Sequence, residues 1–215
     1  MDWISSWVGA LTKPKETFAA EKANASLVEG VKQLALVSAI GGIVFALMFL
    51  AFAAIFTGIT SAFGLTGFFQ GFLGGFLSSG IILLVLLPII MAITSVIITV
   101  VYVGIFYLIC KVLGGTGSFE QQFYLSTIFL IPLEVLMIAL VVAIPLLGIL
   151  LALLLLLYGI YLAYLVTKEV HGFGVVKFVI ALVIYLVVFF ILGKIQEILL
   201  GHPSKYPSQP PIQHY

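Results

Sequence analysis

Glu134 is the residue of this sequence best placed to do chemistry, because it lies about midway along an apolar stretch, in LIPLEVLM, two residues after Pro132. A carboxylate in hydrocarbon is costly, so it must face a bundle interior, find a hydrogen-bond donor or hold a proton. Pro132 leaves a carbonyl one turn earlier without its usual N–H donor, and a protonated carboxyl could satisfy it. Glu134 therefore either binds a proton or cation in a transport path or is a neutral, hydrogen-bonded glutamate that locks helices together. We favour the lock, because no second acid lies within an apolar stretch.

The other reactive side chains form no recognisable catalytic or metal-binding pattern. His171, His202 and His214 are far apart, and the sequence has no H-E-x-x-H, G-x-S-x-G or G-x-x-x-x-G-K-[ST] motif. Cys110 has no nearby histidine and should pack as a small hydrophobe. His171 with Glu169 is either a proton-sensitive pair or a solvated turn, and we favour the turn. We therefore expect no catalytic residue, metal site or cofactor, and no enzyme activity.

The composition indicates that the structural elements carrying these residues lie in a membrane. Of 215 residues, 63% are hydrophobic and 8% are charged, and the mean hydropathy is +1.34. A soluble domain carries about 25% charged residues. The nine basic residues are all lysines, and the net charge of +1 provides no basic field for nucleic acid. The sequence predicts an all-α, integral membrane protein.

Five apolar stretches predict a bundle of five transmembrane helices within residues 34–200. They are residues 34–57, 81–110, 123–144, 146–166 and 175–192. A helix over the first stretch is about 36 Å long, enough to cross about 30 Å of hydrocarbon. Ser26 and Glu29 have capping-box spacing, which predicts that this helix begins near Leu27. Pro88 predicts a kink in the second stretch, and Pro145 a tight turn before the fourth.

Three segments lie outside these stretches. Residues 1–33 form a short amphipathic N-terminal segment, the lead. It is either a cytoplasmic segment that senses lipid or docks a partner, or a structural anchor under the bundle, and we favour the anchor. Residues 58–80 are rich in glycine and phenylalanine and predict an interfacial loop or a re-entrant hairpin. Residues 201–215 are rich in proline and predict a disordered tail.

The lysines predict the orientation of the chain. With five spans and a cytoplasmic N-terminus, seven of the nine lysines fall on the cytoplasmic side: Lys13, Lys15, Lys22, Lys32, Lys111, Lys168 and Lys177. Cytoplasmic loops carry an excess of lysine. We therefore expect a cytoplasmic N-terminus and an external or lumenal C-terminus.

Three segments together resemble the Yip family, the five-pass Ypt-interacting membrane proteins. They are LGGTGSFEQQFYLSTIFLIP (113–132), TKPKETF (12–18) and YGIYLAYLVTKEVHGFGVVKFVIAL (158–182). The resemblance implies a five-helix bundle of a short, prokaryotic-type member, located in the cell membrane if the source is prokaryotic. Its motif residues here are Pro14, Gly114, Gly115, Phe119, Tyr124, Pro132, Glu169, His171 and Gly172. Gly114 and Gly115 would reverse the backbone, Phe119 would pack the loop on the bundle, and Pro132 would bend the third span.

The resemblance implies a membrane scaffold or adaptor, active in membrane organisation or trafficking. Such proteins in eukaryotes work with small GTPases, but this chain lacks a long hydrophilic N-terminal region and a D-L-x-G-P motif, which argues against GTPase binding. The docking surface would comprise the lead, the loop that contains Gly114 and Gly115 (the glycine loop) and the KEVHG turn at residues 168–172. The bilayer and a cytoplasmic protein would be the partners. A homo-oligomer could form through Gly159-x-x-x-Ala163. The alternative is a small transporter or channel that uses Glu134 and residues 58–80 as a gate.

Overall fold

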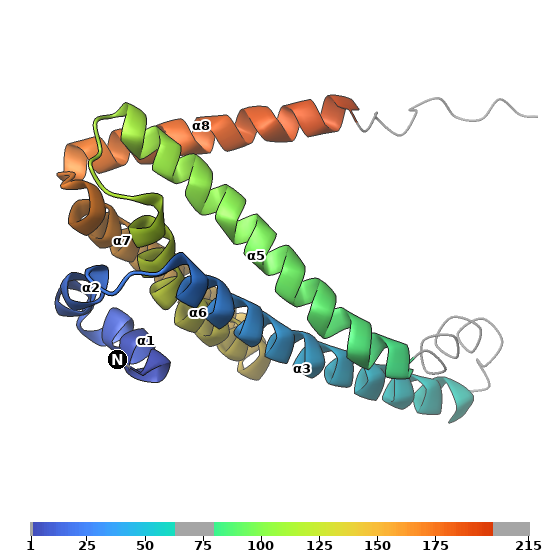
Figure 1. Ribbon diagram of the computed structural model, residues 1–215. Helices are drawn as coiled ribbons and strands as arrows, with labels where there is room; N and C mark the ends of the chain where they lie inside the picture. Colours follow the sequence, from blue (N-terminus) through green and yellow to red (C-terminus); the bar gives the residue numbers. More distant parts are fainter. Residues whose placement is uncertain (1, 63–79, 200–215) are drawn as a thin grey trace, which may run out of the picture.

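The computed structural model describes residues 2–62 and 80–199, and all regular structure within them is α-helical, as expected (Figure 1). The seven helices are α1 (Trp3–Thr12), α2 (Pro14–Lys22), α3 (Leu27–Ala62), α5 (Gly80–Val112), α6 (Phe119–Ala143), α7 (Pro145–His171) and α8 (Val175–Leu199). The predicted tail at 201–215 and most of the predicted loop at 58–80, namely residues 63–79, lie outside the described residues. Residues 58–62 belong to α3, so this part of the loop prediction is wrong.

Five of the helices, α3 and α5 to α8, are long and apolar enough to cross a membrane, which confirms the predicted number of spans. They extend beyond the predicted stretches, since α6 begins at Phe119, α7 continues to His171 and α8 to Leu199. The predicted boundaries followed charged residues. A charged or polar side chain at the end of a span does not interrupt backbone hydrogen bonding, so the helices continue past the hydrocarbon.

Local sequence signals explain where these helices begin and end. α3 begins at Leu27 as predicted, and the Ser26 Oγ accepts the backbone N–H of Glu29 at 3.4 Å. Ser118 caps α6 in a capping box with Gln121, which had not been predicted. Gly172, at φ +70°, ends α7 in the left-handed conformation that glycine adopts most readily.

α6 is the central helix of the bundle and contacts α1, α2, α3, α5 and α7. α3 packs mainly on α5, and α6 packs mainly on α7. Close contact of α3 with α5 depends on Gly42, because a Cβ there would lie 2.7 Å from the Pro88 Cα. α8 contacts α5 and α7, and Figure 1 shows α5 and α8 meeting at one end of the bundle and separating toward the other.

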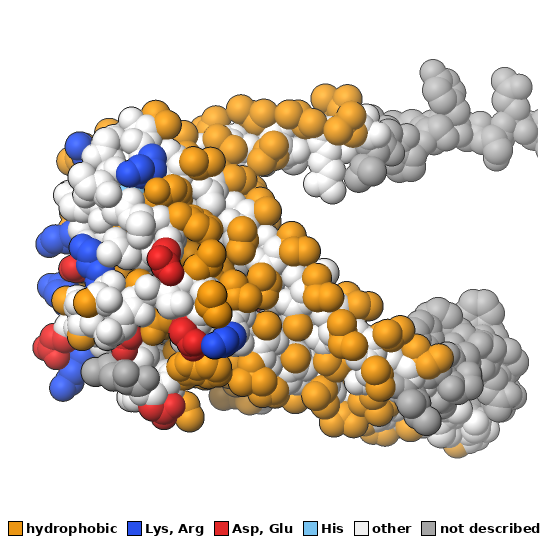
Figure 2. Space-filling view, in the orientation of Figure 1, with side chains coloured by type: hydrophobic (Ala, Val, Ile, Leu, Met, Phe, Trp, Pro, Cys, Tyr) orange, Lys and Arg blue, Asp and Glu red, His pale blue; other side chains and the backbone are white. Residues whose placement is uncertain are grey.

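The charged side chains gather at that same end, while apolar side chains cover most of the remaining visible surface (Figure 2). We call this region the charged end. It comprises α1, α2, the start of α3, the loop at 113–118 and residues 168–177. Many large apolar side chains on the long helices are exposed, for example Ile97, Leu154 and Phe190. A surface of this kind is suited to contact with lipid.

Candidate functional site

A buried carboxylate joins the lead to the bundle at the charged end. Glu21 of α2 is 3% exposed. Its Oε2 accepts the Tyr124 hydroxyl of α6 at 2.9 Å, and its Oε1 accepts the Ser6 hydroxyl of α1 at 2.7 Å. Sequence reasoning singled out Tyr124 but missed Glu21. The available signal was its i,i+3 spacing from Phe18, which places both on one face of α2.

Further contacts hold α1 and α2 against the bundle. The Trp7 indole donates to Gln33 Oε1 of α3 at 2.8 Å, and the Tyr158 hydroxyl of α7 donates to the Leu11 carbonyl of α1 at 2.7 Å. Phe18, 1% exposed, packs edge-on against Phe129 with ring centroids 6.2 Å apart. The lead is therefore part of the folded core, which fits its interpretation as an anchor.

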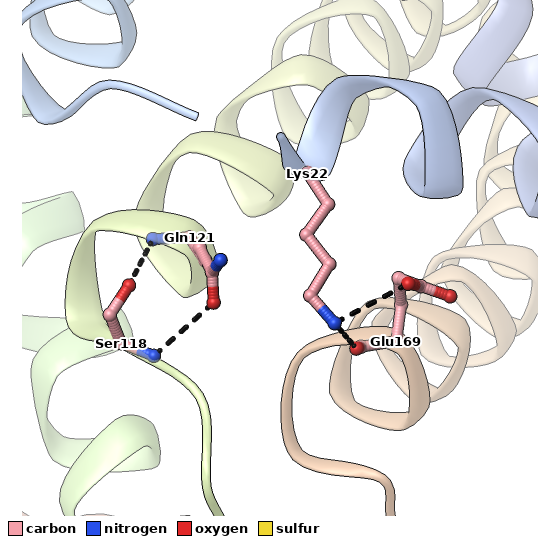
Figure 3. A network of polar contacts seen from close by, with 4 residues as sticks. All are labelled: Lys22, Ser118, Gln121 and Glu169. Carbon is pink, nitrogen blue, oxygen red and sulfur yellow. Dashed lines mark hydrogen bonds and ion pairs between the residues drawn. The ribbon is translucent and has the colours of Figure 1, made fainter. Parts of the chain in front are cut away.

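An ion pair links the end of α2 to the end of α7. Figure 3 shows the Lys22 ammonium pointing at Glu169, where it donates to the backbone carbonyl and lies 3.4 Å from Oε1. The same view shows the Ser118–Gln121 capping box at the start of α6. Glu169 thus pairs with Lys22, and the alternative of a proton-sensitive pair between Glu169 and His171, which we had not favoured, is not formed, because neither His171 ring nitrogen has a partner among the described residues.

The glycine loop packs on the end of α7. Gly114 has φ +86°, so it reverses the chain as predicted. Gly115 acts through close approach instead: a Cβ there would lie 2.6 Å from His171 Nδ1 and 2.8 Å from the Cys110 carbonyl oxygen. Gly117 similarly leaves no room for a Cβ against Val170. The structure therefore brings Gly115, which had been predicted, and Gly117, which had not, into direct contact with the KEVHG turn at residues 168–172.

The prediction of a solvated turn at His171 is wrong, because the residue is 4% exposed. Its ring lies 5.8 Å from the Tyr107 ring and 5.7 Å from the Phe173 ring, centroid to centroid. Within residues 2–62 and 80–199, neither ring nitrogen has a hydrogen-bond partner. The sequence around His171 is polar, but Gly115 from a distant segment covers the ring.

The other motif residues take separate positions. Pro14 occupies the first turn of α2, as predicted. Phe119 is half-buried, with its ring centroid 5.5 Å from that of Tyr107, so it packs the loop on the bundle as expected. Pro132 lies inside α6, which continues through it as one helix.

Gly159 and Ala163, whose spacing suggested a contact between copies, are half-buried within the chain, and a homo-oligomer stays a prediction. A Cβ at Gly159 would lie 3.0 Å from Leu133 Cδ2 of the same chain, and Ala163 packs against the core that contains Leu133. The spacing serves contact between α7 and α6 within the bundle.

Glu134 lines a cavity of about 510 Å³ between the long helices, away from the glycine loop. Its carboxyl makes no hydrogen bond or ion pair with any described residue, so its interpretation as a hydrogen-bonded lock is wrong. Gln122, Ser126 and Thr99 contribute other polar groups to the same cavity. Across the described residues, no group of three or more His, Cys, Asp or Glu side chains is arranged to hold a metal ion.

Comparison with protein families shows that the chain matches the Yip1 domain over residues 8–195. No curated protein and no solved structure matches the chain.

Proposed function

The chain belongs to the Yip1 domain family, and from this membership and the structure of the charged end we propose that it is a non-enzymatic membrane scaffold or adaptor. It is an integral, multi-pass membrane protein with five apolar helices. The charged end is the docking surface for a protein partner. We assign this end to the cytoplasm, since the seven lysines that precede or follow the spans there satisfy the positive-inside rule.

The observation that carries the proposal is the set of hydrogen bonds that buried Glu21 accepts from Ser6 and Tyr124. These hydrogen bonds tie α1, α2 and α6 together, and the Lys22–Glu169 pair adds the end of α7. Segments far apart in the sequence thus form one surface whose parts keep fixed positions. A preorganised surface loses less conformational entropy when a partner binds, which favours recognition.

The chemistry of this surface favours an acidic partner segment. A cavity of about 160 Å³ between α2 and α7 is lined by Lys15, Phe18, Leu165, Lys168 and Glu169. Lys15 and Lys168 are exposed. Two ammonium groups beside apolar side chains would attract a carboxylate flanked by apolar residues, and charge complementarity of this kind gives specificity and a faster association rate. GTPase binding is not part of the proposal.

The test is chemical crosslinking and pulldown from native membranes with charge-neutralised variants. The variant carrying Lys15→Gln and Lys168→Gln should recover less partner than the wild type. The matched control is Lys194→Gln, which removes a lysine from the last turns of α8, and should recover the wild-type amount. Equal recovery by all three proteins, or recovery of no partner by the wild type, would overturn the docking proposal.

A second candidate function is transport, favoured by the position of Glu134 on the cavity. An intramembrane carboxylate that faces a cavity is a general mark of an ion or proton path. Proton flux into liposomes that is present in the wild type and lost in Glu134→Gln, at unchanged thermal stability, would support transport. The absence of flux in the wild type would reject it.

A further inference from the structure

The cavity beside Glu134 has two unlike walls. α6 contributes Gln122, Ser126 and Glu134 among several apolar side chains, while most of the aromatic rings come from α5 and α8. Its volume of about 510 Å³ lies within the range of about 300–1,000 Å³ that is typical of small-molecule sites. Apolar linings with a few polar groups are also typical of such sites.

The charge in the cavity is unbalanced. Among the described residues that line it, Glu134 is the one acidic side chain, and no lysine or histidine lines it. Its carboxyl has no partner in the part of the chain that the structure describes. Glu134 is exposed on the apolar surface of the long helices, where a carboxylate without a counter-ion is unfavourable, so a cation in the cavity would be stabilised.

Gln122 is a second acceptor without a donor. Its side chain lies on the cavity and is 3% exposed, and its Oε1 has no hydrogen-bond partner within residues 2–62 and 80–199. Buried polar atoms in folded proteins are nearly always hydrogen-bonded. Gln122 and Glu134 are separated by about 18 Å along α6, at about 1.5 Å per residue. Gln122 therefore marks a second, separate polar position in the cavity, and Glu134 is the acceptor that favours positive charge.

The aromatic wall is suited to the same ligand. The Phe106 ring lies 5.4 Å from the Tyr185 ring and 6.3 Å from the Phe178 ring, centroid to centroid. Aromatic faces attract cations, more strongly where water is excluded. Tyr102 of α5 lines the cavity and is 45% exposed, so a molecule dissolved in the bilayer can reach the aromatic wall.

We propose that this cavity binds a lipophilic organic cation that partitions into the membrane. Glu134 is its counter-ion, and the aromatic rings of α5 and α8 contact its apolar groups. The inference is independent of the docking proposal and does not require transport.

The experiment measures binding of two probes of the same shape and opposite charge, tetraphenylphosphonium and tetraphenylborate. Calorimetric titration uses the full chain in nanodiscs of neutral lipid, and empty nanodiscs correct for partition into lipid. We expect the cation to bind at least about tenfold more tightly than the anion, because the Glu134 carboxylate attracts one probe and repels the other. Equal affinity, or tighter binding of the anion, would overturn the proposal without any mutation.

Two matched variants then test whether the cation binds beside Glu134. Glu134→Gln should weaken cation binding by about tenfold or more, whereas Glu16→Gln, which removes an exposed carboxylate of α2, should leave it unchanged. Cation binding that persists in Glu134→Gln would show that the site lies elsewhere and would reject the assignment.

Discussion

Replacement of Gly115 by alanine should destabilise the protein strongly, because the loop and the end of α7 leave no room for a methyl group. The added Cβ would lie 2.6 Å from His171 Nδ1 and 2.8 Å from the Cys110 carbonyl oxygen. Carbon atoms make favourable contact at about 3.5–4.0 Å. The His171 ring is 4% exposed and has little space to move, and the Cys110 carbonyl belongs to the backbone of α5 and accepts the Gly115 N–H at 2.8 Å.

The expected cost follows from this geometry. Overpacking a core site destabilises proteins by about 1–3 kcal/mol, and two close contacts, one with backbone, place Gly115→Ala near about 3 kcal/mol. In a chain of this size each kcal/mol lowers the melting midpoint by about 2–4 °C. Thermal unfolding in detergent should therefore show a midpoint about 6–12 °C below that of the wild type.

Gly174→Ala is the matched control. Gly174 is exposed and lies just before α8, and a Cβ there would meet no heavy atom within 4 Å. Its midpoint should equal or slightly exceed that of the wild type. In a double-mutant cycle, Gly115→Ala should cost less when His171 is already alanine, because the ring contact is gone while the carbonyl contact remains. If Gly115→Ala unfolds at the same temperature as Gly174→Ala, the packing argument for the loop is refuted.

Three further changes test other contacts at the charged end by the same unfolding measurement. Tyr124→Phe leaves one oxygen of buried Glu21 without a donor and should cost about 1–3 kcal/mol; a cost near zero would mean that Glu21 does not hold the lead in place. Ser118→Ala removes the cap of α6 and should cost about 1 kcal/mol, which an unchanged midpoint would contradict. Lys22→Met removes a partly exposed ion pair with Glu169 and should cost at most about 1 kcal/mol, so a loss above about 3 kcal/mol would show that this pair behaves as a buried one.

The number and order of the long helices could be read from the sequence because hydrophobic length alone determines what can span a bilayer. The start of α3 was also readable from Ser26 and Glu29. The start of α6 was missed, although Ser118 and Gln121 have the same capping spacing. The charged residues near it were read as the end of a span, whereas the helix begins outside the hydrocarbon.

The candidate site was less accessible to sequence reasoning because its contacts join distant segments. Tyr124 and Gly115 entered through the family resemblance, not through a local pattern. Glu21 and Tyr124 are 103 positions apart, and a glutamate near the end of a short helix is normally solvated. His171 was assigned to solvent for the same reason, since its burial depends on Gly115 and no property of its own helix indicates it.

Glu134 shows a different limit. Its isolation in an apolar stretch was evident, but its environment depends on how five helices meet. Pro132 suggested a nearby acceptor for a protonated carboxyl, whereas the structure places the carboxyl on a cavity without a partner in the described residues. Sequence could identify the unusual residue and not the space beside it.

The central claim is that the charged end is the surface on which a protein partner docks. Its most direct test is photocrosslinking in native membranes with a benzophenone amino acid placed at one exposed position at a time. Glu16 on α2 lies at the charged end, Val112 is the last residue of α5 and directly precedes the loop at 113–118 of that end, and Ile198 lies in the last turn of α8. We predict a discrete adduct of the same partner from Glu16 and Val112 and none from Ile198. Adducts from Ile198 alone, or no adduct from either position at the charged end, would contradict the claim.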